Sequence, residues 1–455
     1  MARTLAGVAD AVSGQLVGGD APFAAVGTDT RSLERGALFV AIRGERHDGN
    51  AFVAEAAARG AAGALVSAPA AEALPQVRVP DTRVALGAMA RAWRRNFPIP
   101  LVAVTGSSGK TTVKELTAAI LGVGRRVCVT QGNLNNDIGL PLTLMRLGAE
   151  HEAAVVELGA NHAGEIGYLA SIAQPAIGVI TNAGAAHLEG FGSVAGVAAA
   201  KGELLDHLPS DGAAVLNADD AFVGEWRARA AVRRVLTFGL GGDADFTIAG
   251  DPAFDASGTR FTMRLPGGAA VDVSLPLPGR QNVANALAAA AAAHAAGAGP
   301  DEIAAGLSRA AGVRGRMTLL AGRAGAVVVD DSYNANPSSA RAALDYLGTL
   351  RGRRVLVLGD MLELGAGAAA LHREIGEYAK GRCDALIAIG PLSREAAAAF
   401  GDAAAAFDDV APAIEALHAM LAEDVTVLVK GSRAMGLERV SAALAAAPGA
   451  GGGSC

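Results

Sequence analysis

The sequence has few cysteines and no long apolar run. Its three cysteines, Cys128, Cys383 and Cys455, are an odd number and form no CxxC pair or metal-ligand spacing. Such a set is typical of a reducing compartment and argues against a disulfide framework or a zinc site. No stretch approaches the ~18 apolar residues that cross a bilayer, and Asp10 interrupts the amino terminus before a signal peptide could form. We therefore expect a cytoplasmic protein without membrane insertion.

Basic residues are too sparse for nucleic-acid binding. Lys and Arg number 39 against 45 Asp and Glu, which gives a net charge of −6, and no basic run occurs. Binding to a phosphate backbone needs a basic face, so a nucleic-acid partner is disfavoured. Aromatic residues make up only 4% of the chain, yet 51% of the residues are hydrophobic and 59 are glycine. This composition excludes intrinsic disorder and indicates a packed protein built from alanine-rich helices.

Lysine is especially scarce, with five copies among the 39 basic residues. A lysine kept in an arginine-rich chain can mark a position that needs a compact or deprotonatable amine, although chance is an equal explanation. Lys110, Lys201 and Lys430 lie in the glycine-bearing motifs GKT, KGE and KGS. These three lysines are therefore the first candidates for a functional role.

The length of 455 residues predicts two or three domains, since ~150 residues is a typical domain size. Residues 1–98 combine short β-like runs with an alanine-rich helical stretch and end near Pro98 and Pro100, which predicts a small α/β domain closed by a linker. Residues 99–313 and 314–455 carry apolar runs separated by helical segments. This pattern is typical of parallel strands joined by right-handed crossovers. We expect a central parallel-sheet domain and a doubly wound, Rossmann-like C-terminal domain.

The runs that we interpret as strands are 37–42, 62–67, 101–106, 153–159, 176–182, 212–220, 326–331, 354–360, 385–390 and 425–431. Residues 243–279 alternate with a period near two, which predicts an antiparallel appendage before a helix at 282–297. The last residues, 447–455, are predicted to be a mobile tail. The fold class is therefore α/β with three domains.

The segment LVAVTGSSGKTTVKELTAAIL, residues 101–121, reads as a strand, a glycine-bearing turn and a helix. Backbone N–H groups of such a turn and the positive end of the helix form an anion site, and a lysine there can reach the β and γ phosphates of a nucleotide. The pattern is TGxxGKTT rather than the full GxxxxGK[ST], because Val104 stands where the first glycine would be. We expect ATP, or a similar triphosphate, with the Thr111 hydroxyl on Mg²⁺. The predicted nucleotide-contacting residues of this loop are Gly106, Ser107, Ser108, Gly109, Lys110, Thr111 and Thr112.

Two further ligand candidates follow predicted strands. Glu157 ends the run AAVVE, and His187 lies five residues after the strand that closes with Asn182. Ligands of open α/β sheets gather outside the carboxyl ends of the strands, so a carboxylate and an imidazole there could hold Mg²⁺ against substrate oxygens. Alternatively, Glu157 could be a solvated strand end and His187 a structural histidine. Both alternatives are less favoured when the two residues lie opposite a phosphate loop.

Eleven segments spread over nearly the whole chain resemble the Mur ligases. They are TDTRSLERGALFVAIRGERHDG (28–49), TGSSGKTTVKE (105–115), GNLNNDIGLPLTL (132–144), ELGANHAGEI (157–166), NAGAAHLEGFGS (182–193), KGEL (201–204), GRQNVANALAA (279–289), GRM (315–317), DDSYNANPSS (330–339), LGDMLELG (358–365) and KGSRAMGLE (430–438). The TGxxGKT loop and the Glu, His and Lys series are shared across the family, including the folylpolyglutamate synthases. GNLNN, ELGANHAGEI, DDSYNANP and KGSRAM resemble the dipeptide-adding member, and the DNPR segment of the diaminopimelate- or lysine-adding member is absent.

The resemblance implies an ATP-dependent ligase that adds D-alanyl-D-alanine to UDP-N-acetylmuramoyl-tripeptide in peptidoglycan precursor synthesis. The tripeptide carboxylate would take the γ-phosphoryl group of ATP, and the dipeptide amine would then attack the acyl phosphate. Lys110 and two Mg²⁺ ions would neutralise charge during transfer. Thr111 and Glu157 would hold one Mg²⁺ and His187 the second, and Lys201 is the position that family members carbamylate with CO₂. Arginine could not readily make that adduct, because it stays protonated.

The resemblance also implies binding residues in all three domains. The ATP base and ribose would contact Asn282, Asn285, Arg316 and Asp331. The uridine diphosphate end would lie near Thr30, Arg31, His47, Asp48 and Gly49, and the sugar or its diphosphate near Asn135, Asn136, Asn161 and His162. The dipeptide would contact Asn334, Asn336, Lys430, Ser432 and Arg433, although 334–337 could equally be a simple Asn-Pro turn. Because these residues lie in different domains, the site would be complete only when the C-terminal domain closes and excludes water.

Three alternatives stay open, and we expect a monomer in each case. The chain could be the diaminopimelate- or lysine-adding Mur ligase, or a ligase similar to folylpolyglutamate synthase. From a different class, it could be a nucleotide-driven switch that uses the phosphate loop without forming an amide. A simple switch does not require the pair of His187 and Lys201, which argues against the last alternative.

Overall fold

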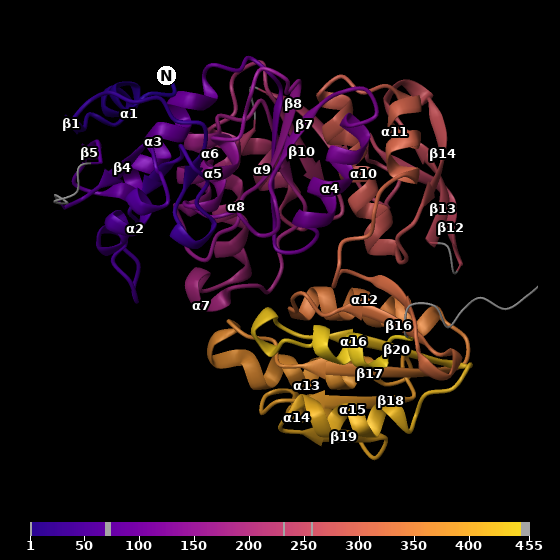
Figure 1. Cartoon of the computed structure of the whole chain (residues 1–455). Helices are drawn as coiled ribbons and strands as arrows, with labels where there is room; N and C mark the ends of the chain where they lie inside the picture. Colours follow the sequence, from indigo (N-terminus) through magenta and orange to yellow (C-terminus); the bar gives the residue numbers. More distant parts are fainter. Residues whose placement is uncertain (1, 69–73, 231–232, 256–257, 447–455) are drawn as a thin grey trace, which may run out of the picture.

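The structure, a computed structural model, describes residues 2–68, 74–230, 233–255 and 258–446. It contains an N-terminal unit, a middle unit and a C-terminal unit, and each has its own mainly parallel sheet (Figure 1). The predicted α/β class with three domains is therefore confirmed. The exact boundaries at 98 and 313 stay predictions, and the predicted tail at 447–455 lies outside the described residues. Within the described ranges no helix is long and apolar enough to span a membrane.

The N-terminal unit has a five-stranded sheet in the order β1-β5-β4-β3-β2, with β1 antiparallel to β5 and the other pairs parallel. Its helices and strands are α1 (Leu5–Val12), β1 (Gln15–Val17), β2 (Val26–Gly27), β3 (Leu38–Val40), α2 (Val53–Ala58), β4 (Gly63–Val66), β5 (Gln76–Arg78) and α3 (Thr82–Arg94). Helix α3 begins after Asp81, whose carboxylate accepts hydrogen bonds from the first free N–H groups of the helix. The helix packs on α5 and α6 of the middle unit, so the two units share one apolar core.

The middle unit has six parallel strands in the order β11-β10-β9-β6-β8-β7. Its elements are β6 (Leu101–Thr105), α4 (Lys110–Leu121), β7 (Val127–Val129), α5 (Gly139–Leu144), β8 (Ala153–Glu157), α6 (Glu165–Ala173), β9 (Ile177–Ile180), α7 (Leu188–Phe191), α8 (Val194–Asp206), β10 (Ala213–Asn217), α9 (Val223–Arg229) and β11 (Arg234–Phe238). Strand β6 and its neighbours β8 and β9 are almost fully buried, which explains their continuous apolar runs. Their carboxyl ends meet at one edge and place the phosphate loop between Glu157 and Asn182.

The predicted antiparallel appendage is confirmed. It consists of β12 (Thr247–Asp255), β13 (Gly258–Arg264) and β14 (Ala270–Leu275), and is followed by α10 (Arg280–Ala295) and α11 (Pro300–Ser308). Alanines 288–293 of α10 have no exposed surface, because the helix packs against α4 and against strands β9, β10 and β11. This burial fixes the start of α10 next to the phosphate loop.

The C-terminal unit has a six-stranded sheet in the order β15-β16-β20-β17-β18-β19, parallel except for β15. Its elements are β15 (Thr318–Ala321), β16 (Val327–Asp331), α12 (Pro337–Thr349), β17 (Arg353–Gly359), α13 (Ala368–Ala379), β18 (Ala385–Ile389), α14 (Ser393–Phe400), β19 (Ala404–Phe407), α15 (Val410–His418), β20 (Val425–Lys430) and α16 (Glu438–Leu444). The edge strands β15 and β19 were not among the predicted strands. Both lack the long buried run of a central strand.

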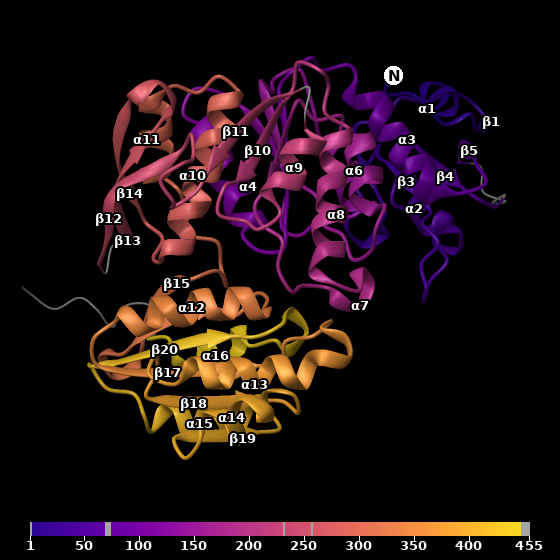
Figure 2. The ribbon, with the colours of Figure 1, turned by 180° about the vertical axis from the view of Figure 1, so that it is seen from behind.

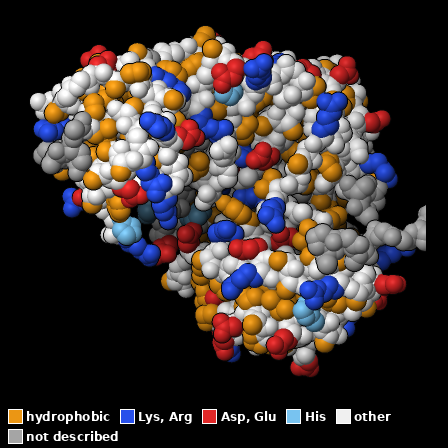
Figure 3. Space-filling model, in the orientation of Figure 1, with side chains coloured by type: hydrophobic (Ala, Val, Ile, Leu, Met, Phe, Trp, Pro, Cys, Tyr) orange, Lys and Arg blue, Asp and Glu red, His pale blue; other side chains and the backbone are white. Residues whose placement is uncertain are grey.

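The apolar cores of the C-terminal unit are separate from those of the other two units. Its buried apolar residues form two clusters, and among the described residues neither includes a residue of the other units. It lies beneath the middle unit in Figures 1 and 2, where α12 contacts α10 and α7 contacts the turn at Gly365–Gly367. The space-filling view shows a hollow between the two masses with charged side chains on its rim (Figure 3). A polar junction of this kind is suited to opening and closing.

Candidate active site

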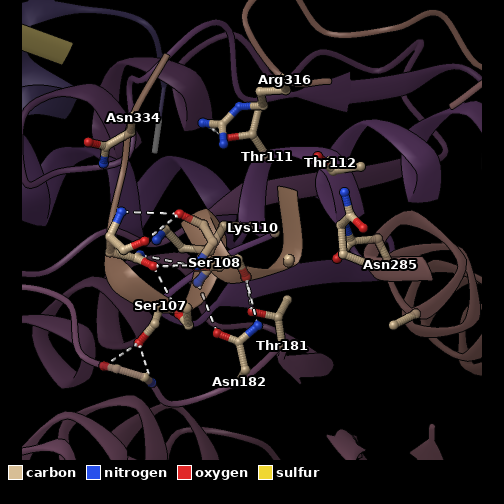
Figure 4. Close-up of a pocket in the computed structure, with 18 of the residues that line it drawn as sticks. Ser107, Ser108, Lys110, Thr111, Thr112, Thr181, Asn182, Asn285, Arg316 and Asn334 are labelled. Atoms are coloured by element: carbon tan, nitrogen blue, oxygen red, sulfur yellow. Dashed lines mark hydrogen bonds between the residues drawn. The ribbon is translucent and has the colours of Figure 1, made fainter. Parts of the chain in front are cut away.

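The phosphate loop, residues 106–109, is built as the sequence predicts. Gly106 has φ +144° and Gly109, which precedes α4, has φ +81°. The strand end after β9 supports the loop from below: Ser108 N–H donates to Asn182 Oδ1 (2.9 Å), and Thr181 Oγ1 donates to the Ser108 carbonyl (2.6 Å; Figure 4). Lys110 Nζ donates to the Gly106 carbonyl (2.7 Å) and folds over the loop. The N–H groups at the start of α4 remain available to an anion.

The Gly106→Ala variant tests this geometry. A Cβ at Gly106 would lie 1.9 Å from Thr181 Oγ1, in a backbone conformation that side chains rarely adopt. We expect the free energy of unfolding to fall by about 2 kcal/mol and ADP affinity, measured by calorimetry, to fall at least about tenfold. The control is Gly242→Ala, because a Cβ there meets nothing within 4 Å. Unchanged ADP affinity in Gly106→Ala would contradict the loop assignment.

Thr111 and Glu157, the two candidates for the first Mg²⁺, are brought together. Thr111 Oγ1 donates to Glu157 Oε2 (2.7 Å), and Asn135 Nδ2 donates to Glu157 Oε1 (2.7 Å). Arg316, from the start of the C-terminal unit, donates through Nη2 to Thr111 Oγ1 (2.8 Å). Glu157 is almost fully buried, and both of its oxygens are held by hydrogen bonds. Asn135, expected at the sugar or diphosphate, therefore also positions this carboxylate.

The donor set fits magnesium rather than a transition metal. No group of three His, Cys, Asp or Glu side chains that could hold a metal occurs within the described residues. Mg²⁺ is usually bound by one or two carboxylates together with substrate phosphates and waters, so a dedicated protein cage is not needed. A hydroxyl and a carboxylate beside a phosphate loop meet this requirement.

His187 and Lys201 both lie near Lys110, and His187 also contacts the C-terminal unit. His187 has φ +52° and precedes α7, and its Nδ1 lies 2.5 Å from Glu363 Oε2 of the C-terminal unit. Burial lowers the pKa of His187; the Glu363 carboxylate opposes this effect, and Lys110 and Lys201 reinforce it. A neutral imidazole is the form that binds metal ions.

Lys201 is not the exposed surface lysine that its helical position alone would suggest. Only 1% of the residue is exposed, and its Nζ lies 5.1 Å from the centre of the Phe191 ring. Burial lowers the pKa of Lys201 to about 7, and the charge of Lys110 contributes. A buried amine that is partly neutral near pH 7 is a reactive group.

The residues predicted to bind the nucleotide line one cavity. It has a volume of about 360 Å³, and Figure 4 shows its lining residues from the phosphate loop, α10 and the C-terminal unit. All the predicted nucleotide residues except Gly106 line it, namely Ser107, Ser108, Gly109, Lys110, Thr111, Thr112, Asn282, Asn285, Arg316 and Asp331. Asn282 donates to the Pro278 carbonyl (2.8 Å), and Asn285 donates to Asn282 Oδ1 (3.1 Å), so both amides are oriented before a ligand arrives.

Several predicted dipeptide residues also face this cavity. Lys430, at the end of β20, forms a buried ion pair with Asp331 at the end of the adjacent strand β16. Burial raises the pKa of the Asp331 carboxyl, and the Lys430 ammonium opposes this effect. Asn336 caps α12 through Ser339 N–H (2.9 Å) and also donates to Ser108 Oγ across the junction (3.1 Å). Contact between these residues and a dipeptide stays a prediction.

The remaining predicted substrate residues are held by local partners. Arg31 pairs with Asp29 (2.6 Å), Asp48 caps the turn at Asn50, and Asn334 Oδ1 accepts from Ala335 N–H. In the N-terminal unit, Thr30 is buried, His47 packs edge-on against Phe52, and a Cβ at Gly49 would lie 2.6 Å from the backbone of Ala41 and Ile42. In the middle unit, Asn136 accepts a hydrogen bond from Gly139 N–H, and Asn161 and His162 are hydrogen-bonded to Glu165. In the C-terminal unit, Ser432 accepts a hydrogen bond from Leu362 N–H, and Arg433 forms an ion pair with Glu438. Their substrate roles stay predictions.

Sequence reasoning missed several residues of the site, and three of them hold predicted residues in place. Thr181 and Asn182 support the phosphate loop, and Glu363 reaches His187. The strand-end rule that singled out Glu157 applies equally to Thr181 and Asn182, which follow β9. Glu363 lies in the segment LGDMLELG, which the resemblance included without giving it a role, and its partner lies 176 positions earlier in the chain.

The chain is similar to known proteins over nearly its whole length. Family models match at residues 22–94 (Mur ligase family, catalytic domain), 104–293 (Mur ligase middle domain) and 315–433 (Mur ligase, glutamate ligase domain). The UDP-N-acetylmuramoyl-tripeptide–D-alanyl-D-alanine ligase of Escherichia coli (strain K12) is 46% identical over 445 residues, which cover 97% of this chain and 98% of that protein. The protein of the same name from Bacillus subtilis (strain 168) is 34% identical, with 96% and 97% covered.

Solved structures agree with the sequence comparisons. A crystal structure of MurF from Acinetobacter baumannii has a TM-score of 0.90 at 35% identity and covers 96% of this chain and 97% of that chain. MurF ligase from Thermotoga maritima in complex with ADP has a TM-score of 0.84 at 28% identity, with 92% and 96% covered. On these matches and the geometry of its phosphate loop, the chain belongs to the Mur ligase family.

Proposed function

We propose that this protein is an ATP-dependent ligase that joins D-alanyl-D-alanine to UDP-N-acetylmuramoyl-tripeptide, releasing ADP and phosphate. The observation that carries the proposal is the cavity lined by the phosphate loop, by Thr111, which donates a hydrogen bond to Glu157, and by the C-terminal residues Arg316 and Asp331. The 46% identical relative bears the name of this activity. ATP hydrolysis and use of a UDP-linked sugar favour a cytoplasmic location.

The chemistry begins with activation of a carboxylate, because oxide is too poor a leaving group for direct amide formation. The terminal carboxylate oxygen of the tripeptide attacks the γ-phosphorus of ATP, and ADP leaves. Lys110 and the N–H groups of the loop stabilise the charge on the transferring phosphoryl group. The neutral amine of the dipeptide then attacks the acyl carbon; it loses a proton, and inorganic phosphate leaves with one oxygen of the original carboxylate.

Mg²⁺ would supply charge neutralisation at the phosphoryl oxygens when bound. Thr111 and Glu157 would hold the ion at the β and γ phosphates, and His187 would hold a second ion nearer the acyl group. The C-terminal unit contributes Arg316 and Asp331 to the same cavity, so closure of the junction orients the nucleotide and excludes water. Water exclusion protects the acyl phosphate from hydrolysis.

Carbamylation of Lys201 is part of the proposal. A neutral amine forms a C–N bond to CO₂ and loses a proton, which leaves a carbamate anion. The burial of Lys201 and its pKa of about 7 favour the neutral amine at physiological pH. The resulting anion would lie near Lys110 and His187, where a negative group can help to position the second ion.

Substrate discrimination tests the proposed function. We expect phosphate release that depends on both the UDP-linked tripeptide and D-alanyl-D-alanine, and none with free diaminopimelate, lysine or glutamate as acceptor. With ¹⁸O in the tripeptide carboxylate, one labelled oxygen should appear in the released phosphate. Turnover that is indifferent to the acceptor would support a nucleotide switch, and unlabelled phosphate would exclude an acyl phosphate.

A further inference from the structure

The loop between β17 and α13 contains the segment DMLELG, residues 360–365, and only one of its side chains reaches the middle unit's metal-site candidates. Glu363 Oε2 lies 2.5 Å from the buried His187 Nδ1, which makes no hydrogen bond of regular geometry among the described residues, and the Glu189 N–H group lies 3.5 Å from the Glu363 carbonyl oxygen. Figures 1 and 2 both show α7 beside the C-terminal unit. The C-terminal unit therefore contacts the middle unit at His187 itself.

Both partners in this contact have an unusual backbone. Within the described part of the chain, six residues other than glycine have positive φ, and His187 (+52°) and Glu363 (+63°) are two of them. Such conformations persist when the surrounding structure enforces them, and they cluster at functional sites. Because both residues of the pair have such a backbone, we take the contact between them to be a specific feature of the junction.

Hydrogen bonds to buried side chains of the C-terminal unit hold this loop in place. Met361 N–H donates to Nε2 of the fully buried His372 (2.8 Å), and His372 Nδ1 bonds the Ala368 carbonyl (2.7 Å). Leu362 N–H donates to Ser432 Oγ (2.9 Å). The position of Glu363 is thus set by packing within its own unit. Its side chain remains 57% exposed, so burial does not account for the contact.

We propose that Glu363 is a positioning residue, which holds His187 by Nδ1 and leaves Nε2 for the second Mg²⁺ when the C-terminal unit closes. This inference rests on the metal role proposed above for His187. A carboxylate on one ring nitrogen fixes the tautomer and orientation of the ring, and the other nitrogen keeps its lone pair for a metal. Because the two residues come from different units, the second metal site is complete only in the closed enzyme.

Manganese binding to the full-length protein tests the proposal without turnover. Electron paramagnetic resonance can count the Mn²⁺ ions bound in the presence of β,γ-methylene-ATP. We expect two in the wild type and, in Glu363→Ala, a second site weakened at least about tenfold, with the first site changed less than twofold. Glu363→Gln should retain most of the second-site affinity, because its amide oxygen can still accept from Nδ1–H.

The matched control is Glu377→Ala. The side chain of Glu377 is 58% exposed and pairs with Lys380 within its own unit, so this variant should bind both ions as the wild type does. If His187→Ala loses the second ion and Glu363→Ala keeps it, the positioning role of Glu363 is overturned, and the metal assignment of His187 stands. Retention of both ions in His187→Ala, or one ion in the wild type, would overturn the metal assignment of His187 and this inference with it. Equal losses in Glu363→Gln and Glu363→Ala would also overturn it.

Discussion

Replacement of Lys110 by methionine is expected to lower kcat for ligation by about 10³-fold. The Lys110 ammonium lies over the loop on the Gly106 carbonyl, and from there it can reach the γ-phosphoryl group of a nucleotide in the loop. Methionine keeps the length of the side chain and removes its charge. The loop N–H groups still hold the phosphates, so ADP affinity should fall by less than about tenfold. Initial rates of phosphate release and ADP calorimetry measure the two effects.

Lys380→Met is the control for this prediction. It removes another of the five lysines, at a half-exposed position where the side chain pairs with Glu377. Its kcat should stay within twofold of wild type, and the melting temperatures of both variants should stay close to that of the wild type. A Lys110→Met enzyme that keeps a tenth of wild-type kcat would show that Lys110 does not stabilise the transferring group.

Lys201→Ala is expected to lower kcat at least about 100-fold and to recover part of it with added acetate or propionate. Truncation of a side chain that is 99% buried leaves a cavity beside Phe191, and a short carboxylate can place its anion there. Rescue that increases with acid concentration and then saturates would indicate a bound anion in place of the carbamate. Ligation assays across a range of acid concentrations measure it.

Lys201→Met distinguishes this rescue from a general salt effect. Methionine fills most of the space of the lysine and leaves no room for the acid, so this variant should stay inactive at every acid concentration. In the wild type, ¹³C-bicarbonate should give a carbamate resonance that both variants lack. An active Lys201→Ala enzyme, or equal rescue of both variants, would remove the carbamate from the mechanism.

The sequence predicted those features that depend on residues close together in the chain. The phosphate loop follows from a buried strand, two glycines and a lysine within ten positions, and the structure has it with positive φ at Gly106 and Gly109. The central strands follow from continuous apolar runs, because both faces of a parallel sheet are covered. The edge strands β15 and β19 were missed because a partly exposed strand lacks such a run.

The sequence by itself determined the α/β class, the nucleotide loop and most of the residue types at the site, since these depend on local backbone preferences and on the period of the apolar residues. Only the tertiary structure decided which side chains meet. The pairs of Glu157 with Asn135 and His187 with Glu363 join segments far apart in the chain. Strand order, register and the approach of two separately packed units create these contacts, and no local pattern encodes them.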